Sequence, residues 1–177
     1  MFIFTVDDEV SLALVQPSFA KEYYRIVCQE RAYLSTWLAW PPHANEEAFF
    51  ERFIQGALHD YADGKSLTCA IVYQERVVGN VSFNTICHQL KKVEIGYWLS
   101  ESYQGKGIAS RSVSAMIKMA FEDLGMEKVQ IAVATENQPS RRLCERLGFR
   151  LEGEISNAEN LNGRIVDHAI YGLQVTR

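Results

Sequence analysis

A short loop rich in glycine stands between a predicted strand and a predicted helix, at Gln104-Gly105-Lys106-Gly107-Ile108-Ala109. Residues 91–100 alternate like a half-buried strand, and residues 113–124 carry apolar side chains at helical spacing. The first backbone N–H groups of a helix lack helical partners, and the helix dipole adds positive charge there. Glycine lets the backbone approach a ligand without interference from a Cβ. The junction therefore predicts an anion site, above all for a pyrophosphate.

Two common nucleotide motifs do not explain this loop. A Walker loop requires the spacing GxxxxGK[ST], which is absent here. A dinucleotide-binding fingerprint requires GxGxxG; Gly105 and Gly107 begin it, but Ser110 occupies the third position and the preceding strands are predicted to be antiparallel. From the loop alone, a helix start that uses glycine for a tight turn explains the pattern as well as phosphate binding does.

The order of predicted elements is β-α-α-β-β-β-α-β-α-β-β. Tight-turn signals at 74–76 and at Asn162-Gly163 predict hairpins, whereas the helices before and after 128–135 predict crossovers. Hairpins give antiparallel pairs and crossovers give parallel ones, so we expect an α/β (α+β) fold with one mixed sheet of about seven strands. The predicted strands are 10–15, 67–73, 77–86, 91–100, 128–135, 149–156 and 164–175, and the early helices are 17–30, a piece within 31–42, and one capped by Asn45.

Composition indicates one domain, residues 1–177, with 47% hydrophobic residues. The net charge is −4, which argues against DNA or RNA binding. The first 60 residues hold nine acids and four bases; these form either solvated helix faces or an acidic surface for a cationic partner. The beginning of the chain has no basic segment followed by a long apolar run, so we predict neither a signal peptide nor a membrane span, and a cytoplasmic protein.

The four cysteines are widely spaced and include no CxxC pair. We therefore predict no metal site. Cys28, Cys69 and Cys144 stand inside apolar patterns and are predicted to pack in the core.

The chain resembles the GNAT acyltransferases. Gln104-x-x-Gly107-x-Ala109 matches their Q/R-x-x-G-x-G/A motif, which grips the pyrophosphate of acetyl-CoA, and the strand with EIGYWL, Asn137, Ser140 and the element order fit as well. The resemblance covers nearly the whole chain. It implies the GNAT fold, acetyl-CoA as co-substrate, and a gap between the strands 91–100 and 128–135 that holds the pantetheine.

Three stretches are similar to the RimJ/RimL-type branch, and most of all to RimL-like enzymes, which acetylate an N-terminal serine of the ribosomal stalk protein. They are YLSTWLAWP (33–41), EIGYWLSESYQGKGIAS (94–110) and AENLNGRIVDHAIYGL (158–173). The resemblance implies a protein N-terminus, with a ribosomal protein as partner, as the acceptor. It also implies a homodimer.

Acetyl transfer requires a neutral amine to attack the thioester. An α-amine with a pKa of about 7.7–8.0 is roughly one-tenth neutral at pH 7, whereas a lysine at about 10.4 is neutral in well under one part in a thousand. An N-terminal acceptor therefore needs only a modest base, such as a carboxylate acting directly or through one water.

The resemblance implies Glu159 as this base, with Glu94 as the second candidate; the alternatives are an exposed turn acid and a cross-sheet ion pair. Many GNAT enzymes carry a tyrosine after the leucine of the helix that follows Asn137, but Leu143 is followed by Cys144 here. The RimL-like pattern instead places Ser140 near the CoA sulfur. As a residue near a helix start, Ser140 also fits a capping role.

The resemblance implies further contacts on both sides of the reaction. The acetyl-CoA contacts comprise Trp98, Leu99, Gln104, Gly105, Lys106, Gly107, Ile108, Ala109 and Asn137. The acceptor contacts comprise Tyr33, Trp37, Trp40, Asn160 and Asn162. The aromatic residues fit a core role equally well, and the asparagines fit the turn.

Two other functions stay open from the sequence. The first is acetylation of a small amine, such as a polyamine, an aminoglycoside or an amino acid, which a deep closed pocket would favour over an open groove between 33–43 and 158–164. The second is a non-catalytic CoA-binding sensor or ribosome-associated module, to which the cysteine at 144 lends weight.

Overall fold

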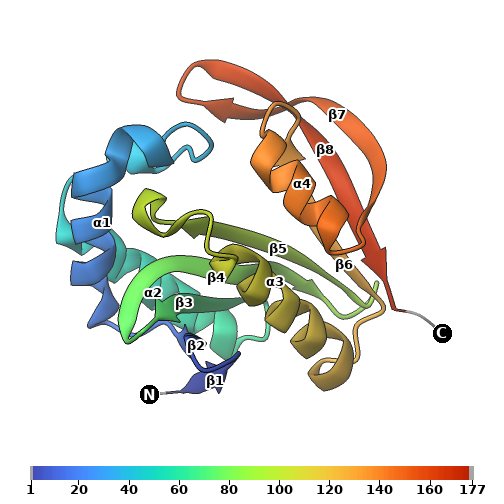
Figure 1. Ribbon diagram of the computed structural model, residues 1–177, viewed down its shortest axis with the longest axis horizontal. Helices are drawn as coiled ribbons and strands as arrows, with labels where there is room; N and C mark the ends of the chain where they lie inside the picture. The colour runs from blue at the N-terminus through green and yellow to red at the C-terminus, as the bar shows by residue number, and fades with distance from the viewer. Residues whose placement is uncertain (1, 176–177) are drawn as a thin grey trace.

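The computed structural model describes residues 2–175 and contains one eight-stranded sheet in the order β1-β2-β3-β4-β5-β6-β8-β7. Helices α1 and α2 cover one face of the sheet, and α3 and α4 cover the other (Figure 1). The elements are β1 (Ile3–Thr5), β2 (Val10–Leu14), α1 (Phe19–Leu34), α2 (Glu47–Ala62), β3 (Leu67–Tyr73), β4 (Arg76–Cys87), β5 (Lys92–Leu99), α3 (Ile108–Lys118), which continues as a π-helical turn (Met119–Asp123), β6 (Lys128–Ala134), α4 (Gln138–Arg146), β7 (Arg150–Leu161) and β8 (Arg164–Gln174).

The predicted mixed sheet is confirmed, because β5 and β6 pair in parallel and the other neighbouring strands pair antiparallel. Both predicted tight turns are present, with positive φ at Gln74 and Glu75 and at Asn162 and Gly163. The prediction of about seven strands missed β1. This strand has three residues, too few for a periodic signal, and pairs with β2.

The sheet opens in its middle, between β5 and β6. These strands pair only at Lys92–Lys128, Val93–Val129 and Glu94–Gln130. Beyond this point β5 runs on to Leu99 and β6 to Ala134, each paired with its other neighbour. The separation that the GNAT resemblance implied is therefore present.

The early helices differ in detail from the prediction. The predicted division near residue 30 is confirmed, because Glu30 has non-helical dihedrals, φ −128° and ψ 22°, and breaks α1 into two pieces. The second piece ends at Leu34, and within 31–42 a short 3-10 helix begins only at Pro41. Helix α2 is preceded by Glu46 as its N-cap rather than by Asn45, whose carbonyl instead accepts a hydrogen bond of 3.0 Å from the Tyr24 hydroxyl.

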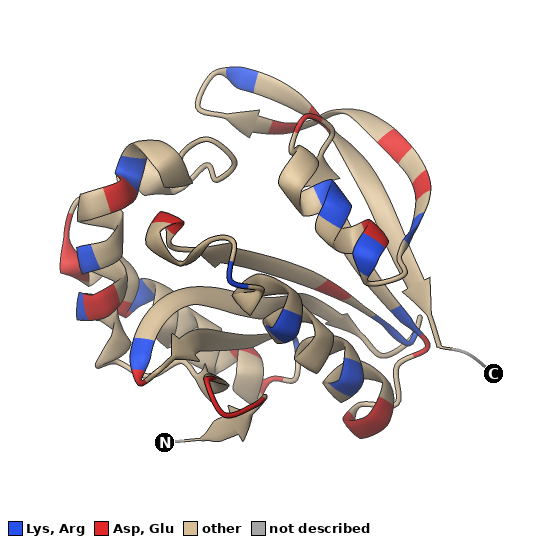
Figure 2. Cartoon of the chain, viewed as in Figure 1, with Lys and Arg blue, Asp and Glu red and all other residues tan. Residues whose placement is uncertain are grey.

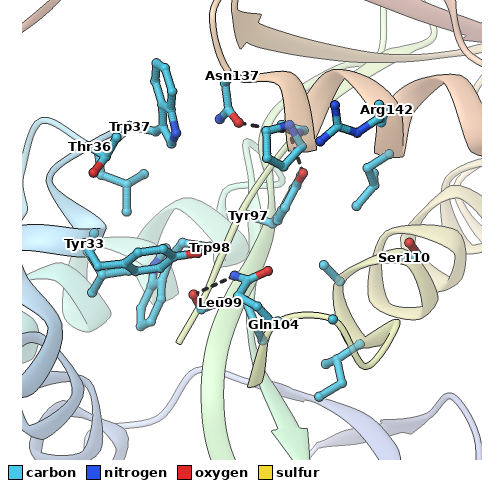
Figure 3. Close-up of a pocket in the computed structure, with 18 of the residues that line it drawn as sticks. Tyr33, Thr36, Trp37, Tyr97, Trp98, Leu99, Gln104, Ser110, Asn137 and Arg142 are labelled. Atoms are coloured by element: carbon cyan, nitrogen blue, oxygen red, sulfur yellow. Dashed lines mark hydrogen bonds between the residues drawn. The ribbon is translucent and has the colours of Figure 1, made fainter. Parts of the chain in front are cut away.

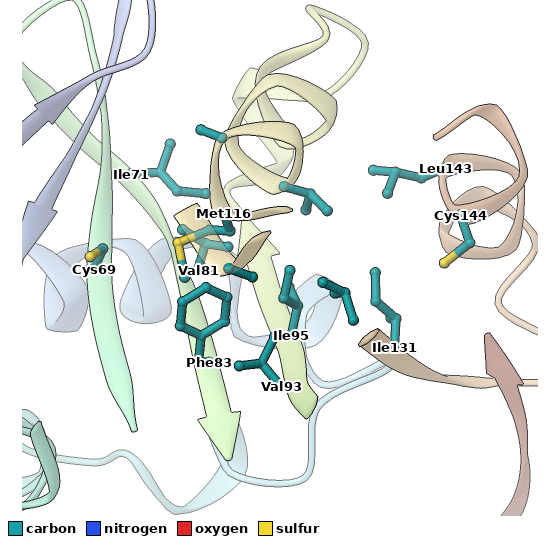
Figure 4. Close-up of a cluster of buried hydrophobic side chains, with 14 of the residues drawn as sticks. Cys69, Ile71, Val81, Phe83, Val93, Ile95, Met116, Ile131, Leu143 and Cys144 are labelled. Atoms are coloured by element: carbon teal, nitrogen blue, oxygen red, sulfur yellow. The ribbon is translucent and has the colours of Figure 1, made fainter. Parts of the chain in front are cut away.

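The core has one main cluster on each face of the sheet. The cluster beneath α3 and α4 includes Cys69, Met116 and Cys144 (Figure 4). The predicted burial of Cys69 and Cys144 is confirmed, but Cys28 is exposed, so its prediction as a core residue was wrong. Cys28 lies on α1, and the helix turns this position toward solvent while Ile26 and Val27 are buried.

Candidate active site

The glycine loop has the backbone geometry of an anion site. Gly105 has φ of 75° and Gly107 has φ of 70°, and Gly107 is the N-cap of α3. These left-handed conformations favour glycine. A Cβ built at either position would meet no atom within 4 Å, so the space beside the first N–H groups of α3 is open. The loop therefore has room for a pyrophosphate against the N-terminus of the helix.

Arg111 anchors this loop from the first turn of α3. Its Nη2 donates to the carbonyl of Lys106 at 3.3 Å, and its Nη1 lies 2.8 Å from a carboxylate oxygen of Asp7 and 3.1 Å from one of Glu9. The backbone N–H of Glu9, followed by Arg111, holds the pKa of Asp7 below its ordinary value. The loop is thus tied to the turn between β1 and β2.

A first cavity of about 420 Å³ lies where the loop, the end of β5, α1 and α4 converge (Figure 3). It is lined by Tyr33, Leu34, Thr36, Trp37, Leu38, Tyr97, Trp98, Leu99, Gln104, Gly105, Gly107, Ile108, Ala109, Ser110, Asn137, Pro139, Ser140, Arg142, Leu143 and Arg146. The cavity therefore joins the open end of the β5–β6 gap to the N-terminus of α3. Most of the acetyl-CoA contacts that the resemblance implied lie together around it.

The side chain of Lys106 does not supply the charge of this cavity. Its Nζ lies over the rings of Tyr103 and Tyr73, 5.1 and 5.8 Å from their centres. Two arginines on α4, Arg142 and Arg146, line the cavity instead, and Figure 2 shows basic residues along this helix. Sequence reasoning missed both, although a run of basic residues after Asn137 was visible.

The sulfur-side candidates Asn137 and Ser140 stand at the start of α4. Asn137 is the N-cap, and its Oδ1 accepts a hydrogen bond from the backbone N–H of Ser140 at 3.3 Å. The Ser140 hydroxyl lies 2.7 Å from the hydroxyl of Tyr97 on β5 (Figure 3). Both residues line the cavity. The predicted capping role of Ser140 was wrong, because Asn137 is the N-cap and the Ser140 hydroxyl contacts Tyr97 instead. Tyr97 was missed in the sequence.

Cys144 is fully buried one turn further along α4. Burial raises the pKa of its thiol to about 12. A neutral thiol in the core is a poor nucleophile, and the residue packs with Leu143 and Ile131 (Figure 4). This environment argues against an acetylated cysteine as an intermediate.

The end of β5 is held to the loop by Gln104. Its Nε2 donates to the carbonyl of Leu99 at 3.2 Å, which leaves the second lone pair of that oxygen for another donor. Residues 100–102, just before the loop, are fixed from α1 by Glu30. The Glu30 carboxylate accepts hydrogen bonds from the Ser100 hydroxyl at 2.7 Å, the Glu101 N–H at 2.8 Å and the Ser102 hydroxyl at 3.2 Å. The kink in α1 is therefore coupled to the approach to the loop.

A second cavity, of about 620 Å³, lies on the α1–α2 face of the sheet. It meets the first cavity at Leu38, Tyr97 and Trp98, which line both. Its lining is Tyr23, Leu38, Trp40, Phe49, Phe50, Arg52, Phe53, Gly56, Ala57, Asp60, Ser66, Thr68, Asn80, Ser82, Asn84, Gly96, Tyr97 and Trp98. Aromatic walls and a floor of hydroxyl and amide groups give it the character of a small-ligand or side-chain pocket.

The predicted acceptor aromatics divide between the two cavities. Tyr33 and Trp37 line the first, and Trp40 lines the second. The ring of Trp40 lies 5.8 Å from that of Trp98 and 5.7 Å from that of Phe50. These residues therefore form both a part of the core and a wall of a cavity.

Asn160 and Asn162 serve the β7–β8 hairpin and, within residues 2–175, neither lines these cavities. Asn160 Oδ1 accepts a hydrogen bond of 2.6 Å from the N–H of Gly163 in the turn. Asn162 Nδ2 donates to the carbonyl of Ala39 at 3.0 Å, and its Oδ1 lies 2.9 Å from His43 Nε2. These contacts hold the tip of the β7–β8 hairpin against segment 36–43.

The two candidates for the base, Glu159 and Glu94, lie at different places on the same face of the sheet. Glu159 Oε2 lies 2.9 Å from His168 Nε2 on β8, and its side chain is one-third exposed. Leu161, two residues on and therefore on the same face of β7, packs against Trp37. Glu94 accepts a hydrogen bond of 3.1 Å from Gln130 in the closed part of the β5–β6 pair. Neither Glu159 nor Glu94 is among the described residues that line the two cavities.

In the part of the chain that the structure describes, no group of three or more His, Cys, Asp or Glu could hold a metal ion. The helices described there include none long and apolar enough to cross a membrane.

Comparisons with known proteins agree with this geometry. Residues 10–150 match the model of the acetyltransferase (GNAT) domain. The ribosomal-protein-serine acetyltransferase of Escherichia coli (strain K12) is 31% identical over 166 residues, which cover 94% of this chain and 93% of that protein.

Two solved structures are also similar. RimL, a ribosomal L7/L12 alpha-N-protein acetyltransferase in complex with coenzyme A, aligns with a TM-score of 0.94 at 29% identity and covers 98% of each chain. The microcin C7 self-immunity acetyltransferase MccE, in complex with acetyl-CoA and AMP, aligns with a TM-score of 0.92 at 33% identity and covers 96% of this chain and 94% of that one. With its open sheet, its glycine loop and these matches, the chain belongs to the GNAT acetyltransferase family and uses acetyl-CoA as its co-substrate.

Proposed function

We propose that this acetyltransferase moves the acetyl group of acetyl-CoA to the N-terminal α-amine of a ribosomal protein. The meeting of the two cavities at Leu38, Tyr97 and Trp98 carries the proposal. A donor in the first cavity and an amine in the second would meet at this point, which suits direct attack in a ternary complex within a single domain of residues 1–177. The burial of Cys144 supports the absence of an acyl-enzyme step.

On the donor side, we assign the phosphates of acetyl-CoA to the first N–H groups of α3, with Arg142 and Arg146 opposite them. The pantetheine follows the unpaired parts of β5 and β6, with Asn137 at one end. Backbone groups at Trp98 and Leu99 polarise the thioester carbonyl, in the manner of an oxyanion hole. The remaining donor contacts are Gln104, Gly105, Gly107, Ile108, Ala109 and the backbone of Lys106.

Glu159 is the first candidate for the base that removes the amine proton. It shares a strand face with Leu161, which contacts Trp37 beside the first cavity. About one-tenth of an α-amine is neutral at pH 7, so a carboxylate acting through a water suffices. Glu94 is the second candidate, and its place in the closed part of the sheet weakens it.

The protein acceptor rests on the relatives, since the curated relative described above is named for a ribosomal-protein serine and the RimL structure for L7/L12. Tyr33, Trp37 and Trp40 then wall the amine site. A small amine is the second candidate, because Asp60 lines the second cavity and the hairpin tip is bridged to segment 36–43. Asn160 and Asn162 would act on either acceptor through the hairpin.

We also propose that the protein works in the cytoplasm, where ribosomal acceptors are, and as a homodimer. The edge strand β7 supports a dimer, because Leu151 and Ile155 on this strand and the neighbouring Ile165 on β8 are exposed apolar side chains. Sedimentation velocity at micromolar concentration tests this, and a single monomer species would contradict it.

A thiol-release assay with acetyl-CoA tests the acceptor. The panel contains serine- and alanine-initiated ribosomal N-terminal peptides, spermidine, an aminoglycoside and free amino acids. Faster release with the serine-initiated peptide than with any small amine supports the proposal. Release with a small amine alone supports the second candidate. Acetyl-CoA binding without turnover on any amine would overturn both and favour a binding module.

Glu159→Gln tests the base. We expect kcat to fall by about 10²–10⁴-fold, the usual contribution of a general base. The matched control is Glu154→Gln on the same strand, since the Glu154 carboxylate is exposed and faces Arg141 of α4 at 3.7 Å. Equal activity of Glu159→Gln and Glu154→Gln would refute the role of Glu159 and direct the test to Glu94→Gln.

A further inference from the structure

One side-chain hydrogen bond spans the gap between β5 and α4. The hydroxyl oxygens of Tyr97 and Ser140 lie 2.7 Å apart, and the two residues are 43 positions apart in the chain. Both line the first cavity, and Tyr97 also lines the second. In Figure 3 the side chain of Tyr97 points from β5 toward the start of α4. Tyr97 therefore lies where the two cavities meet, and Ser140 lies on the side of the first cavity.

The phenol of Tyr97 has a proton to donate, and either hydroxyl of the pair can be the donor. Burial raises the pKa of Tyr97 to about 12, so the phenol stays protonated at neutral pH. A proton transfer from such a phenol to a thiolate, whose ordinary pKa is about 8.5 in a cysteine, would be uphill. Tyr97 can therefore give a hydrogen bond but is a poor source of a proton.

The backbone of Ser140 is already fixed, because its N–H donates to Asn137 Oδ1 at 3.3 Å. A serine hydroxyl has one proton and two lone pairs. If Ser140 Oγ accepts from Tyr97, its own proton is free to point into the cavity. Its position in the first turn of α4 adds the positive end of a helix dipole, which favours a developing negative charge nearby.

We propose that Tyr97 is a positioning residue that makes Ser140 a one-directional hydrogen-bond donor to the thioester sulfur. This rests on the proposed function and on the place near the CoA sulfur that the resemblance implies for Ser140, which lines the first cavity. Ser140, held by Tyr97, thereby takes the place of the tyrosine hydroxyl that the family resemblance leads us to expect at position 144. Cys144 cannot do so, because its thiol is buried in the core.

The acetyl transfer needs no reactant besides acetyl-CoA, the amine and solvent. The amine nitrogen forms a bond to the carbonyl carbon, and its proton leaves to the base. The carbon–sulfur bond then breaks, and sulfur takes the electron pair. The Ser140 O–H stabilises this charge by a hydrogen bond while Tyr97 holds the hydroxyl in place, and the released thiolate takes a proton from solvent.

A double-mutant cycle tests the coupling. We expect Tyr97→Phe to lower kcat about tenfold while KM for acetyl-CoA changes less than about twofold, because a hydrogen bond that matters in the transition state is lost. We expect Tyr97→Phe to have no further effect when Ser140→Ala is already present. Tyr61→Phe, an exposed tyrosine on α2, is the control and should match the wild type. Additive losses in the double variant would overturn the proposal.

Equilibrium binding gives a readout besides turnover. Calorimetry compares CoA with acetyl-CoA at about pH 9, where the ionised fraction of the CoA thiol is much larger than at pH 7. We expect Tyr97→Phe and Ser140→Ala each to weaken CoA about three- to tenfold and to leave acetyl-CoA nearly unchanged. Equal weakening of both ligands means a structural role and refutes the proposal. If the wild type turns over no amine, the proposed function fails, and the binding comparison still decides the role of Tyr97.

Discussion

Replacing Gly107 with alanine separates the backbone role of the loop from its role in binding. Gly107 has φ of 70° and caps α3. A Cβ there would meet no atom within 4 Å, so the substitution meets no steric clash in the free protein. The cost to folding is then the left-handed conformation alone, about 1 kcal/mol. For a chain of 150–250 residues, this lowers Tm by about 2–4 °C.

The effect on acetyl-CoA is expected to be larger. The new methyl group would project into the open space beside the first N–H groups of α3, where the phosphates are proposed to lie. Losing or lengthening one hydrogen bond from these groups to a charged phosphate costs about 1.5–3 kcal/mol. We therefore expect the Kd for acetyl-CoA to rise by about ten- to a hundredfold, measured by calorimetry.

Gly64→Ala is the matched control. Gly64 follows α2, has φ of 69°, and a Cβ there would also meet nothing within 4 Å. The two variants should lose similar stability, but Gly64→Ala should bind acetyl-CoA like the wild type. Normal binding by Gly107→Ala, or equal loss of binding by both variants, would show that the loop is not the phosphate site.

Three further outcomes follow from the described contacts. Glu30→Gln should raise KM for acetyl-CoA several-fold with a smaller change in kcat, because the carboxylate that fixes Ser100 and its neighbours is weakened; an unchanged KM would refute this coupling. Iodoacetamide at about pH 8, followed by mass spectrometry, should modify exposed Cys28 but not Cys144, whose pKa is about 12; early labelling of Cys144 would contradict its burial. The pKa of Asp7 is lowered by folding, so the stabilisation that its carboxylate gives is present above about pH 4 and is lost as the pH falls further. The urea midpoint of Asp7→Asn should therefore change less with pH below pH 4 than that of the wild type. Parallel plots of urea midpoint against pH for the two proteins would refute the effect.

The parts of the fold that the sequence predicted have local signals. The turns at Gln74-Glu75 and Asn162-Gly163 contain residues with positive φ, and the residues at both positions indicate a tight turn in the sequence. The mixed sheet followed from the order of hairpins and crossovers. The short strand β1 was missed, since three residues carry no period. The break in α1 at Glu30 falls where the first predicted helix ends, but the hydrogen bonds that tie Glu30 to a segment 70 residues away have no signal in the sequence.

The chemistry of the site was less predictable, because it depends on which distant residues the fold brings together. Ser140 was predicted as a site residue, but the residue whose hydroxyl it contacts, Tyr97, lies on another element. Glu159 was predicted as the base, but the alternation of β8 alone does not reveal that His168 contacts it. Lys106 had the expected charge in the expected loop, yet two tyrosine rings hold its side chain elsewhere. Side-chain direction, which these cases require, is set by packing rather than by local pattern.

The opening of the sheet itself explains why an acyl donor with amide groups suits this fold. Where β5 and β6 separate after Glu94 and Gln130, the facing backbone N–H and C=O groups lose their partners. Such groups are rarely left without hydrogen bonds. The protein satisfies part of this demand, since Gln104 donates to the carbonyl of Leu99. A pantetheine arm, which carries two amides in an extended chain, can act as a short strand in the remaining gap. In the proposed arrangement, the backbone that leaves the sheet open there would orient the thioester toward the second cavity, where the amine would bind.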